Sequence, residues 1–541
     1  MREYKKIAIK IIKKLNYIIP IILVTIASYG YLLIHNTVNI DVLSGDKYFN
    51  GEYLIAQKRI AGPILQKVFG IFDFYPFLAD FIAVILFIIA SVLFCTLFHV
   101  TSKGKIKTIA YTIFSCLFIS YPLMMQFFPY IPMGISIGLG YCLVAISILS
   151  FESFLRSQKC LYAIISIGTL WCSISLYESF ATVYIMVVLS ILLIEILFLN
   201  KKISEIIFKG LKFILPLLIA ILLNIIVSNL ILALGNIKII SNAQKEILYF
   251  AIGIKSTIKN LIETVTIDYI ISAFGYLPFT ILLMSSIISF VIAIIFSIKK
   301  KDVSIFLIII GMNITLLLLS IMQGMAAAYR TCQQFPIFVG VIFMVLTQLV
   351  LSTKLNKNIK NIFLFFIFLI ILYQVKDLYY WEYLNTVRYE KEKQDVIAIG
   401  NDIVKNYNYK EKPVVFCGQY NLTQKVKEQI TIKKDSLYYK ILKYYNKNFT
   451  DKRIKDLNNY VYTQTSIQSY IDWSITAFAQ NGEPINEELT KFFYLLGYDI
   501  KQNDLDIESY IELIRENVNL FKDKDKTSIF ETDKYIIVYF S

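Results

Sequence analysis

The sequence has little histidine and no closely paired cysteines. Only His35 and His99 occur in its 541 residues, and none of its seven cysteines belongs to a C-x-x-C pair. Protein zinc sites are built largely from His and Cys ligands, so this composition argues against a zinc site. Because most of the cysteines lie in or beside apolar runs, we expect them to be small buried apolar side chains.

The chain also lacks several motifs that mark soluble enzymes and transporters. It contains no Walker A motif, no G-x-G-x-x-G and no H-E-x-x-H. Charge is scarce within the apolar runs, where Glu152, Glu195 and Asp80 lie near the ends. Ion-coupled transporters usually need ionisable groups at mid-depth in the membrane, so the pattern argues against one.

What the sequence has in excess is apolar length. Hydrophobic residues make up 57% of the chain, more than soluble proteins usually carry. A helix of about 20 apolar residues crosses the hydrocarbon core of a bilayer. We therefore predict a mainly α fold, a polytopic membrane helical bundle of about 11 spans. The spans are expected near 17–35, 77–99, 108–126, 134–154, 160–177, 180–199, 211–234, 272–298, 303–322, 332–352 and 361–375.

Basic residues indicate how these spans are oriented. A net charge of +15 would suggest a nucleic-acid partner in a soluble protein, but here basic residues punctuate the apolar runs, so we expect a bilayer and no nucleic acid. With a cytoplasmic N-terminus, 20 Lys and Arg fall in inside segments and nine in outside loops. The positive-inside rule therefore predicts a multi-pass cell-membrane protein with an exterior C-terminal region.

The composition changes near residue 376. We expect a transmembrane domain over 1–375 and an exterior C-terminal domain over 376–541, which is enough chain for one small domain. Residues 378–407 are typical of a helix that leaves the membrane, and 413–418 and 535–540 of buried strands. Helical patterns at 486–496 and 505–517 complete a small α/β or α+β domain.

The exterior loop 36–76 follows the first span and carries acidic and basic side chains. Asp41 and Asp46 could act as a base for an acceptor hydroxyl, or they could be solvated loop residues. Apolar residues from Ile55 to Val68 recur at helical spacing, which is typical of a helix lying at the membrane surface. Lys58 and Arg59 within that stretch suit a lipid phosphate.

Three more polar or aromatic features fall on the predicted exterior side. Tyr177 and Glu178 form a sharp turn between two spans, and Tyr329 and Arg330 precede another span. An arginine at a membrane edge suits a phosphate, although it could also simply extend to the interface. The aromatic and proline segment 127–132 could stack on a sugar, or it could belong to an interfacial aromatic belt.

Several of these segments together resemble a known family. The residues are Ile40 and Asp41, then 51–53 through 59–63, then 173–178 between two spans, then Tyr329 and Arg330 with Pro336 opening a late span, and 412–418 in the tail. This arrangement is similar to the GtrII-type bacterial glucosyltransferases, which are GT-C-like polytopic membrane glycosyltransferases. The resemblance implies transfer of a sugar, typically glucose, from a polyprenyl-phosphate donor to a surface polysaccharide or related glycopolymer on the outer face.

The resemblance also implies roles for individual residues. Asp41 would be the catalytic base, and Asp46 is a second candidate because Val42, not a second acid, follows Asp41. The donor phosphate would be bound by Arg330, Arg59 and Lys58, and the substrates would contact Tyr177, Glu178 and Tyr329. A divalent metal could assist, although the sequence contains no clear ligand set. Two alternatives stay open: a glycopolymer polymerase or ligase, and a flippase or transporter of lipid-linked sugar.

Overall fold

The computed structural model describes most of the chain. The described residues are 2–35, 37, 51–69, 76–128, 131–237, 253–271, 273, 277–300, 302–420, 440, 471, 475, 485–517, 519 and 527–540. The chain divides into two compact units. The bundle unit comprises Met1–Ile34, Phe49–Tyr380 and Lys434–Asn448, and the C-terminal unit comprises His35–Tyr48, Trp381–Lys433 and Phe449–Ser541.

Helices make up most of the described part of the bundle unit, and the last of them continues into the C-terminal unit from Trp381 on. In chain order they are α1 (Arg2–Ile12), α2 (Leu15–Ile34), α5 (Gly51–Ala56), α6 (Ala61–Phe69), α7 (Pro76–Thr101), α8 (Thr108–Ile119), η1 (Pro122–Phe127), α9 (Ile131–Ser157), α10 (Cys160–Leu176), α11 (Phe180–Leu199), α12 (Ile203–Gly235), α15 (Ile254–Glu263), η2 (Thr264–Ile271), α16 (Leu277–Lys300), α17 (Ser304–Gln323), η4 (Tyr329–Thr331), α18 (Gln334–Ser352) and α19 (Lys357–Asn406). Helix α9 packs against both α7 and α10, while α8 packs against α2 and α18.

The predicted class of a polytopic helical bundle is confirmed. Among the described residues, ten helices are long and apolar enough to cross a membrane. The one remaining predicted span, 160–177, corresponds to the shorter apolar helix α10 of 17 residues. Apolar length is therefore a reliable guide to the helices of this unit.

Two helical segments differ from the sequence-based expectation. The surface helix expected through 55–68 is two short helices, α5 and α6, with Lys58 in the left-handed region at φ 63°. Pro63 explains the break, because in a continuous helix its ring would clash with the Arg59 carbonyl and supply no N–H to it. The reverse holds for α19, where a span and a separate helix were expected. That segment is one 50-residue helix, since it contains no proline.

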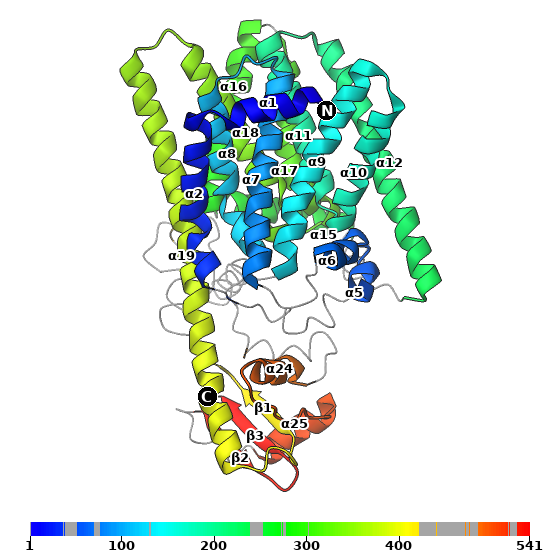
Figure 1. The fold of residues 1–541 in the computed structure, drawn as a ribbon, viewed down its shortest axis with the longest axis vertical. Coiled ribbons are helices and arrows are strands. Elements are labelled where there is room, and N and C mark those ends of the chain that lie inside the picture. The colour runs from blue at the N-terminus through cyan, green and yellow to red at the C-terminus, as the bar shows by residue number, and fades with distance from the viewer. Residues whose placement is uncertain are drawn as a thin grey trace. The chain divides into compact units, whose positions relative to one another are not determined.

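The bundle unit has two ends with different chemistry. Figure 1 shows α1 lying across one end of the helices and α5 and α6 at the opposite end; we call these the α1 end and the α6 end. At the α1 end the Lys105 and Lys107 ammonium groups donate to the Phe198 and Leu351 carbonyls, at 2.8 and 3.1 Å. Lys300 donates to the Asn200 side chain there, at 2.7 Å.

A buried ion network joins α9, α11 and α12. The Lys209 ammonium group pairs with Glu152 and lies 2.8 Å from Glu195 Oε1. Lys201 pairs with the other Glu195 oxygen at 3.0 Å. Both glutamates are 4% exposed, so each needs a counter-charge to remain ionised. Lys209 of α12 therefore supplies positive charge to a carboxylate on α9 and to another on α11.

The described C-terminal unit is built around a small sheet. Strands β1 (Val414–Gly418), β2 (Ser528–Glu531) and β3 (Ile536–Phe540) are ordered β1-β3-β2, with β1 parallel and β2 antiparallel to β3. Residues of α19 and of α24 (Glu487–Leu495) pack on one face, and α25 (Ile507–Glu516) packs on the other. The strands at 413–418 and 535–540 and both helices were predicted, whereas β2 was not.

The ion network gives a stability prediction. Substituting Lys209→Met should lower the free energy of unfolding by about 3 kcal/mol, because two buried carboxylates lose their shared counter-charge. The measurement is thermal unfolding of the purified protein in neutral detergent. Lys212→Met is the matched control, since Lys212 lies on the same helix and is exposed. Equal melting temperatures for the two variants would contradict the network's role.

Candidate functional site

Arg59 and Tyr177 are in contact at the α6 end. The Arg59 guanidinium carbon is 4.5 Å from the centre of the Tyr177 ring, a cation–π contact. The Ala61 backbone N–H donates to Ser175 Oγ at 3.1 Å, which ties the start of α6 to the end of α10. Two residues that the sequence analysis singled out separately are therefore in direct contact, and Lys58 precedes them at the left-handed turn.

The turn between α10 and α11 is tied to the start of α18. Ser179 Oγ donates to Gln333 Oε1 at 2.6 Å, and Thr182 Oγ1 donates to Gln334 Oε1 at 3.0 Å. Tyr177 in this turn is buried, whereas Glu178 is exposed. The turn thus holds the Tyr177 ring against Arg59 and leaves the Glu178 carboxylate accessible.

Close packing of α9 fixes the position of this turn. A Cβ atom at Gly140 would lie 2.1 Å from Phe180 Cε2, so only glycine leaves room for the ring that opens α11. Ser173 Oγ donates to the Gly140 carbonyl at 3.0 Å, and the Tyr141 ring meets Phe180 edge-on at 5.3 Å. Tyr141 also donates to the Gln333 carbonyl at 2.7 Å. Helix α9 therefore positions both the turn and the start of α18.

Tyr329 and Arg330 lie on η4, directly before α18. The Tyr329 ring is buried against Phe279 and Phe335, with centroid distances of 5.3 and 6.2 Å. Arg330 is exposed. Because Gln333 follows three residues later and bonds to Ser179, the segment that carries Arg330 is linked to the turn that carries Tyr177. Element η4 also contacts η1, whose last residue, Phe127, is the first residue of the predicted aromatic segment.

The structure thus gathers most of the predicted site at one end of the bundle unit. Lys58 and Arg59, the turn at Tyr177, and η4 are joined through the contacts described above. The two predicted catalytic carboxylates, Asp41 and Asp46, lie outside the described residues, and so do residues 129 and 130 of the aromatic segment. Their assignment stays a prediction.

A buried polar stripe on α19 was not singled out from the sequence. Asn385 Nδ2 donates to Thr37 Oγ1 at 2.7 Å, and Arg388 Nη2 donates to Asn385 Oδ1 at 2.6 Å. Arg388 Nη1 also lies 3.5 Å from Glu392 Oε2. These α19 side chains are all nearly fully buried within the C-terminal unit. Their spacing of three and four residues is a helix-face signal that could have revealed the stripe.

Glu382 lies one turn before Asn385 on the same stripe and beyond the apolar segment 361–375. Its side chain is 1% exposed, and neither carboxyl oxygen has a hydrogen-bond partner in the described part of the chain. Burial raises the pKa of the Glu382 carboxyl to about 8, because the charged form loses its hydration. Burial thus favours the uncharged form of this carboxyl, which can donate a hydrogen bond.

No group of three or more His, Cys, Asp or Glu suited to a metal ion occurs within the described residues. That search does not include Asp41 or Asp46, which fall in the gap after residue 37. Lys58, Arg59 and Arg330 are cations of the described site, and their chemistry fits an anionic substrate.

Comparison with known proteins gives one match. A family model described as "Glucosyl transferase GtrII" matches residues 30–347, which is more than half of the chain. The matched region runs from the end of α2 into α18 and contains every predicted site residue. No curated protein and no solved structure matches the chain.

The glycine contact gives a prediction for the site's framework. Gly140→Ala should lower the free energy of unfolding by about 2 kcal/mol, because the added methyl group displaces Phe180 and the turn before it. Gly168→Ala on α10 is the control, since a Cβ atom there meets nothing within 4 Å. Thermal unfolding in detergent measures both. If Gly140→Ala melts at the same temperature as Gly168→Ala, the packing account is wrong.

Proposed function

The chain belongs to the GtrII glucosyl transferase family, and we propose that it moves glucose from a polyprenyl-phosphate donor to a surface polysaccharide or other glycopolymer. The ten membrane-length helices among the residues that the structure describes make it a multi-pass membrane glycosyltransferase. The observation that carries the proposal is the family match over residues 30–347, which spans the entire α6-end site. We place the reaction on the outer face of the cell membrane.

The distribution of charge between the two ends supports this orientation. Lys105, Lys107 and Lys300 lie at the α1 end together with the basic helix α1. These are residues that the positive-inside rule assigns to the cytoplasm. The α6 end then faces the exterior, where nucleotide sugars are absent and an activated sugar must arrive on a lipid.

Arg59 and Arg330 are the proposed ligands of the donor phosphate, with Lys58 beside them. Guanidinium groups bind phosphate oxygens through paired, charge-assisted hydrogen bonds. The Tyr177 ring supports Arg59 from one face, which leaves the edge of the guanidinium group for the phosphate. Tyr177, Glu178 and Tyr329 are the proposed contacts to the sugar or acceptor.

The proposed chemistry is a single displacement at the anomeric carbon of the sugar. The acceptor hydroxyl oxygen forms the new bond to that carbon, while the bond from the carbon to the phosphate oxygen breaks. Asp41 accepts the hydroxyl proton, and Asp46 is the alternative base. The leaving lipid phosphate keeps the bonding electrons, so it needs cationic stabilisation more than it needs an acid. This course inverts the anomeric centre.

The base assignment predicts a specific loss of activity. Asp41→Asn should reduce transfer of labelled glucose from polyprenyl-phosphate glucose roughly a hundredfold or more. Asp46→Asn tests the alternative, and Glu205→Gln, an exposed acid in the first turn of α12, is the control. Full activity in both aspartate variants would remove the assignment. In the same membranes, growth of acceptor chains would identify a polymerase, and lipid-sugar movement without transfer would identify a flippase.

The phosphate assignment predicts an effect on donor binding. Arg59→Gln should raise KM for the polyprenyl-phosphate sugar roughly tenfold or more, since it removes a hydrogen bond to a charged group. Lys67→Gln is the control, because Lys67 is an exposed cation on the neighbouring α6. Steady-state kinetics at saturating acceptor measure both variants. An unchanged KM in Arg59→Gln would argue against donor binding by this residue.

A further inference from the structure

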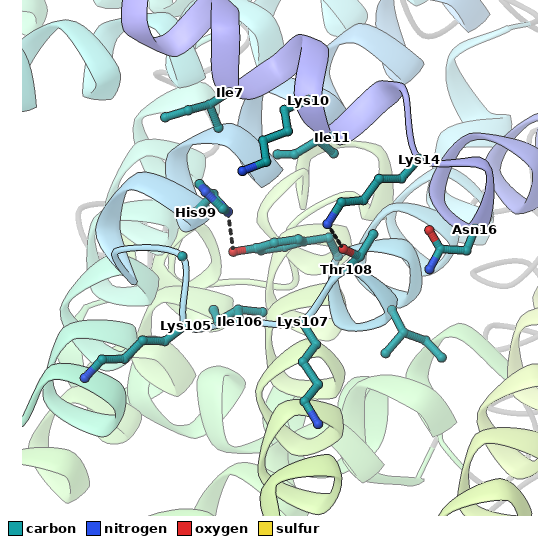
Figure 2. Close-up of a pocket in the computed structure, with 13 residues that line it drawn as sticks. Ile7, Lys10, Ile11, Lys14, Asn16, His99, Lys105, Ile106, Lys107 and Thr108 are labelled. Atoms are coloured by element: carbon teal, nitrogen blue, oxygen red, sulfur yellow. Dashed lines mark hydrogen bonds between the residues drawn. The ribbon is translucent and has the colours of Figure 1, made fainter.

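A polar cavity lies at the α1 end, away from the α6-end site. Its volume is about 520 Å³, and it is bounded by α1, the end of α7 and the segment from Gly104 to Tyr111. Figure 2 shows this cavity with its lining side chains. Nothing in the proposed transfer reaction uses it, because α5 and α6 lie at the opposite end of the same unit (Figure 1).

The lining of this cavity is cationic. Figure 2 shows Lys10 pointing toward His99 and Lys14 pointing toward Thr108. Lys14 Nζ donates to Thr108 Oγ1 at 2.6 Å, and the Tyr111 hydroxyl lies 3.5 Å from His99 Nδ1. No carboxylate occurs among the described residues that line the cavity. Two ammonium groups therefore face one cavity with no acidic counterpart in its wall.

Two other lysines of the wall are directed elsewhere. The ammonium groups of Lys105 and Lys107 donate to the Phe198 and Leu351 carbonyls, so these side chains leave the cavity. Their backbone contributes to the wall where α8 begins. The Lys107 side chain makes no capping hydrogen bond to α8, and the Lys107 N–H donates to Gln348 Oε1 at 2.8 Å. A helix N-terminus carries partial positive charge. The helix start thus adds to the attraction that Lys10 and Lys14 exert on an anion.

The surroundings of the cavity favour a lipid over a small ion. Ile7, Ile11 and Ile106 form an apolar part of its wall. Directly after Lys14, Leu15 and Ile19 begin an exposed apolar face of α2, which continues along the helix to Ile26. The acyl chain of a lipid can lie along that face while its phosphate occupies the cationic cavity. Inorganic phosphate would occupy the cavity alone and leave the apolar face uncovered.

We propose that the cavity beneath α1 binds the phosphate group of an anionic membrane phospholipid. Lys10 and Lys14 supply the charge, Thr108 and the start of α8 supply further donors, and α2 accommodates an acyl chain. Basic cavities between membrane helices commonly bind anionic head groups in this way. The bound lipid joins α1 to the α7–α8 connection and so stabilises this end of the bundle unit.

The test is lipid-dependent thermal unfolding of the full-length protein in neutral detergent. Phosphatidylglycerol should raise the melting temperature in a saturable way, and phosphatidylcholine should not. In the Lys10→Gln/Lys14→Gln double variant the apparent Kd for phosphatidylglycerol should rise on the order of thirtyfold. Lys6→Gln/Lys13→Gln is the matched control, since it removes two exposed charges from the same segment outside the cavity wall.

Each further outcome has a defined meaning. Lys10→Arg/Lys14→Arg should retain the lipid effect, and the single Gln variants should show intermediate losses if the double variant does not fold. Inorganic phosphate is the third probe. If inorganic phosphate raises the melting temperature as much as phosphatidylglycerol does, and this rise is absent in the double variant, the ligand is free phosphate and the lipid proposal is wrong. An equal response to phosphatidylglycerol in the double variant and its control would overturn the site.

Discussion

The cost of placing charge in hydrocarbon is the constraint on which the rest of this structure depends. The bundle unit meets it by moving ionised groups to its two ends and neutralising them there. At the α1 end Lys209 serves Glu152 and Glu195 together, while at the α6 end Arg59 rests on the Tyr177 ring. The two ends consequently differ in chemistry, with a basic, ion-paired end opposite an end rich in aromatic and amide groups.

Between those ends, aromatic side chains pack against one another and hold the helices that carry the candidate site. The Tyr141 ring meets Phe118 and Phe180 edge-on, at 5.1 and 5.3 Å, and its hydroxyl donates to the Gln333 carbonyl. One side chain of α9 therefore holds the start of α11 and the start of α18. A site supported by packed helices keeps its geometry better than one supported by loops, which suits transfer of a sugar between two bound substrates.

The sequence predicted features that depend on local patterns, such as helices, and did not predict contacts between segments that are distant in the chain. Apolar length is a local signal, so all the predicted spans have counterparts among the described helices. The break between α5 and α6 was missed, although Pro63 is a local signal. The apolar residues keep helical spacing across the break, and that spacing predicted a single helix. The contact of Arg59 with Tyr177 joins segments more than a hundred residues apart, and no pattern within either segment predicts it. Strand β2 has only four residues, too few for a period to show.

The α19 stripe extends this argument to the part of the chain beyond the family match, which ends at residue 347. Asn385 binds Thr37 across 348 residues of sequence, and Thr37 lies four residues before Asp41. Arg388 and Glu392 continue the same buried face. Burying these polar groups is costly unless they are paired, and the Asn385–Thr37 and Arg388–Asn385 hydrogen bonds supply such pairing. The described contact of α19 with the segment after α2 is therefore the Asn385–Thr37 hydrogen bond, which fixes Thr37 against the buried stripe.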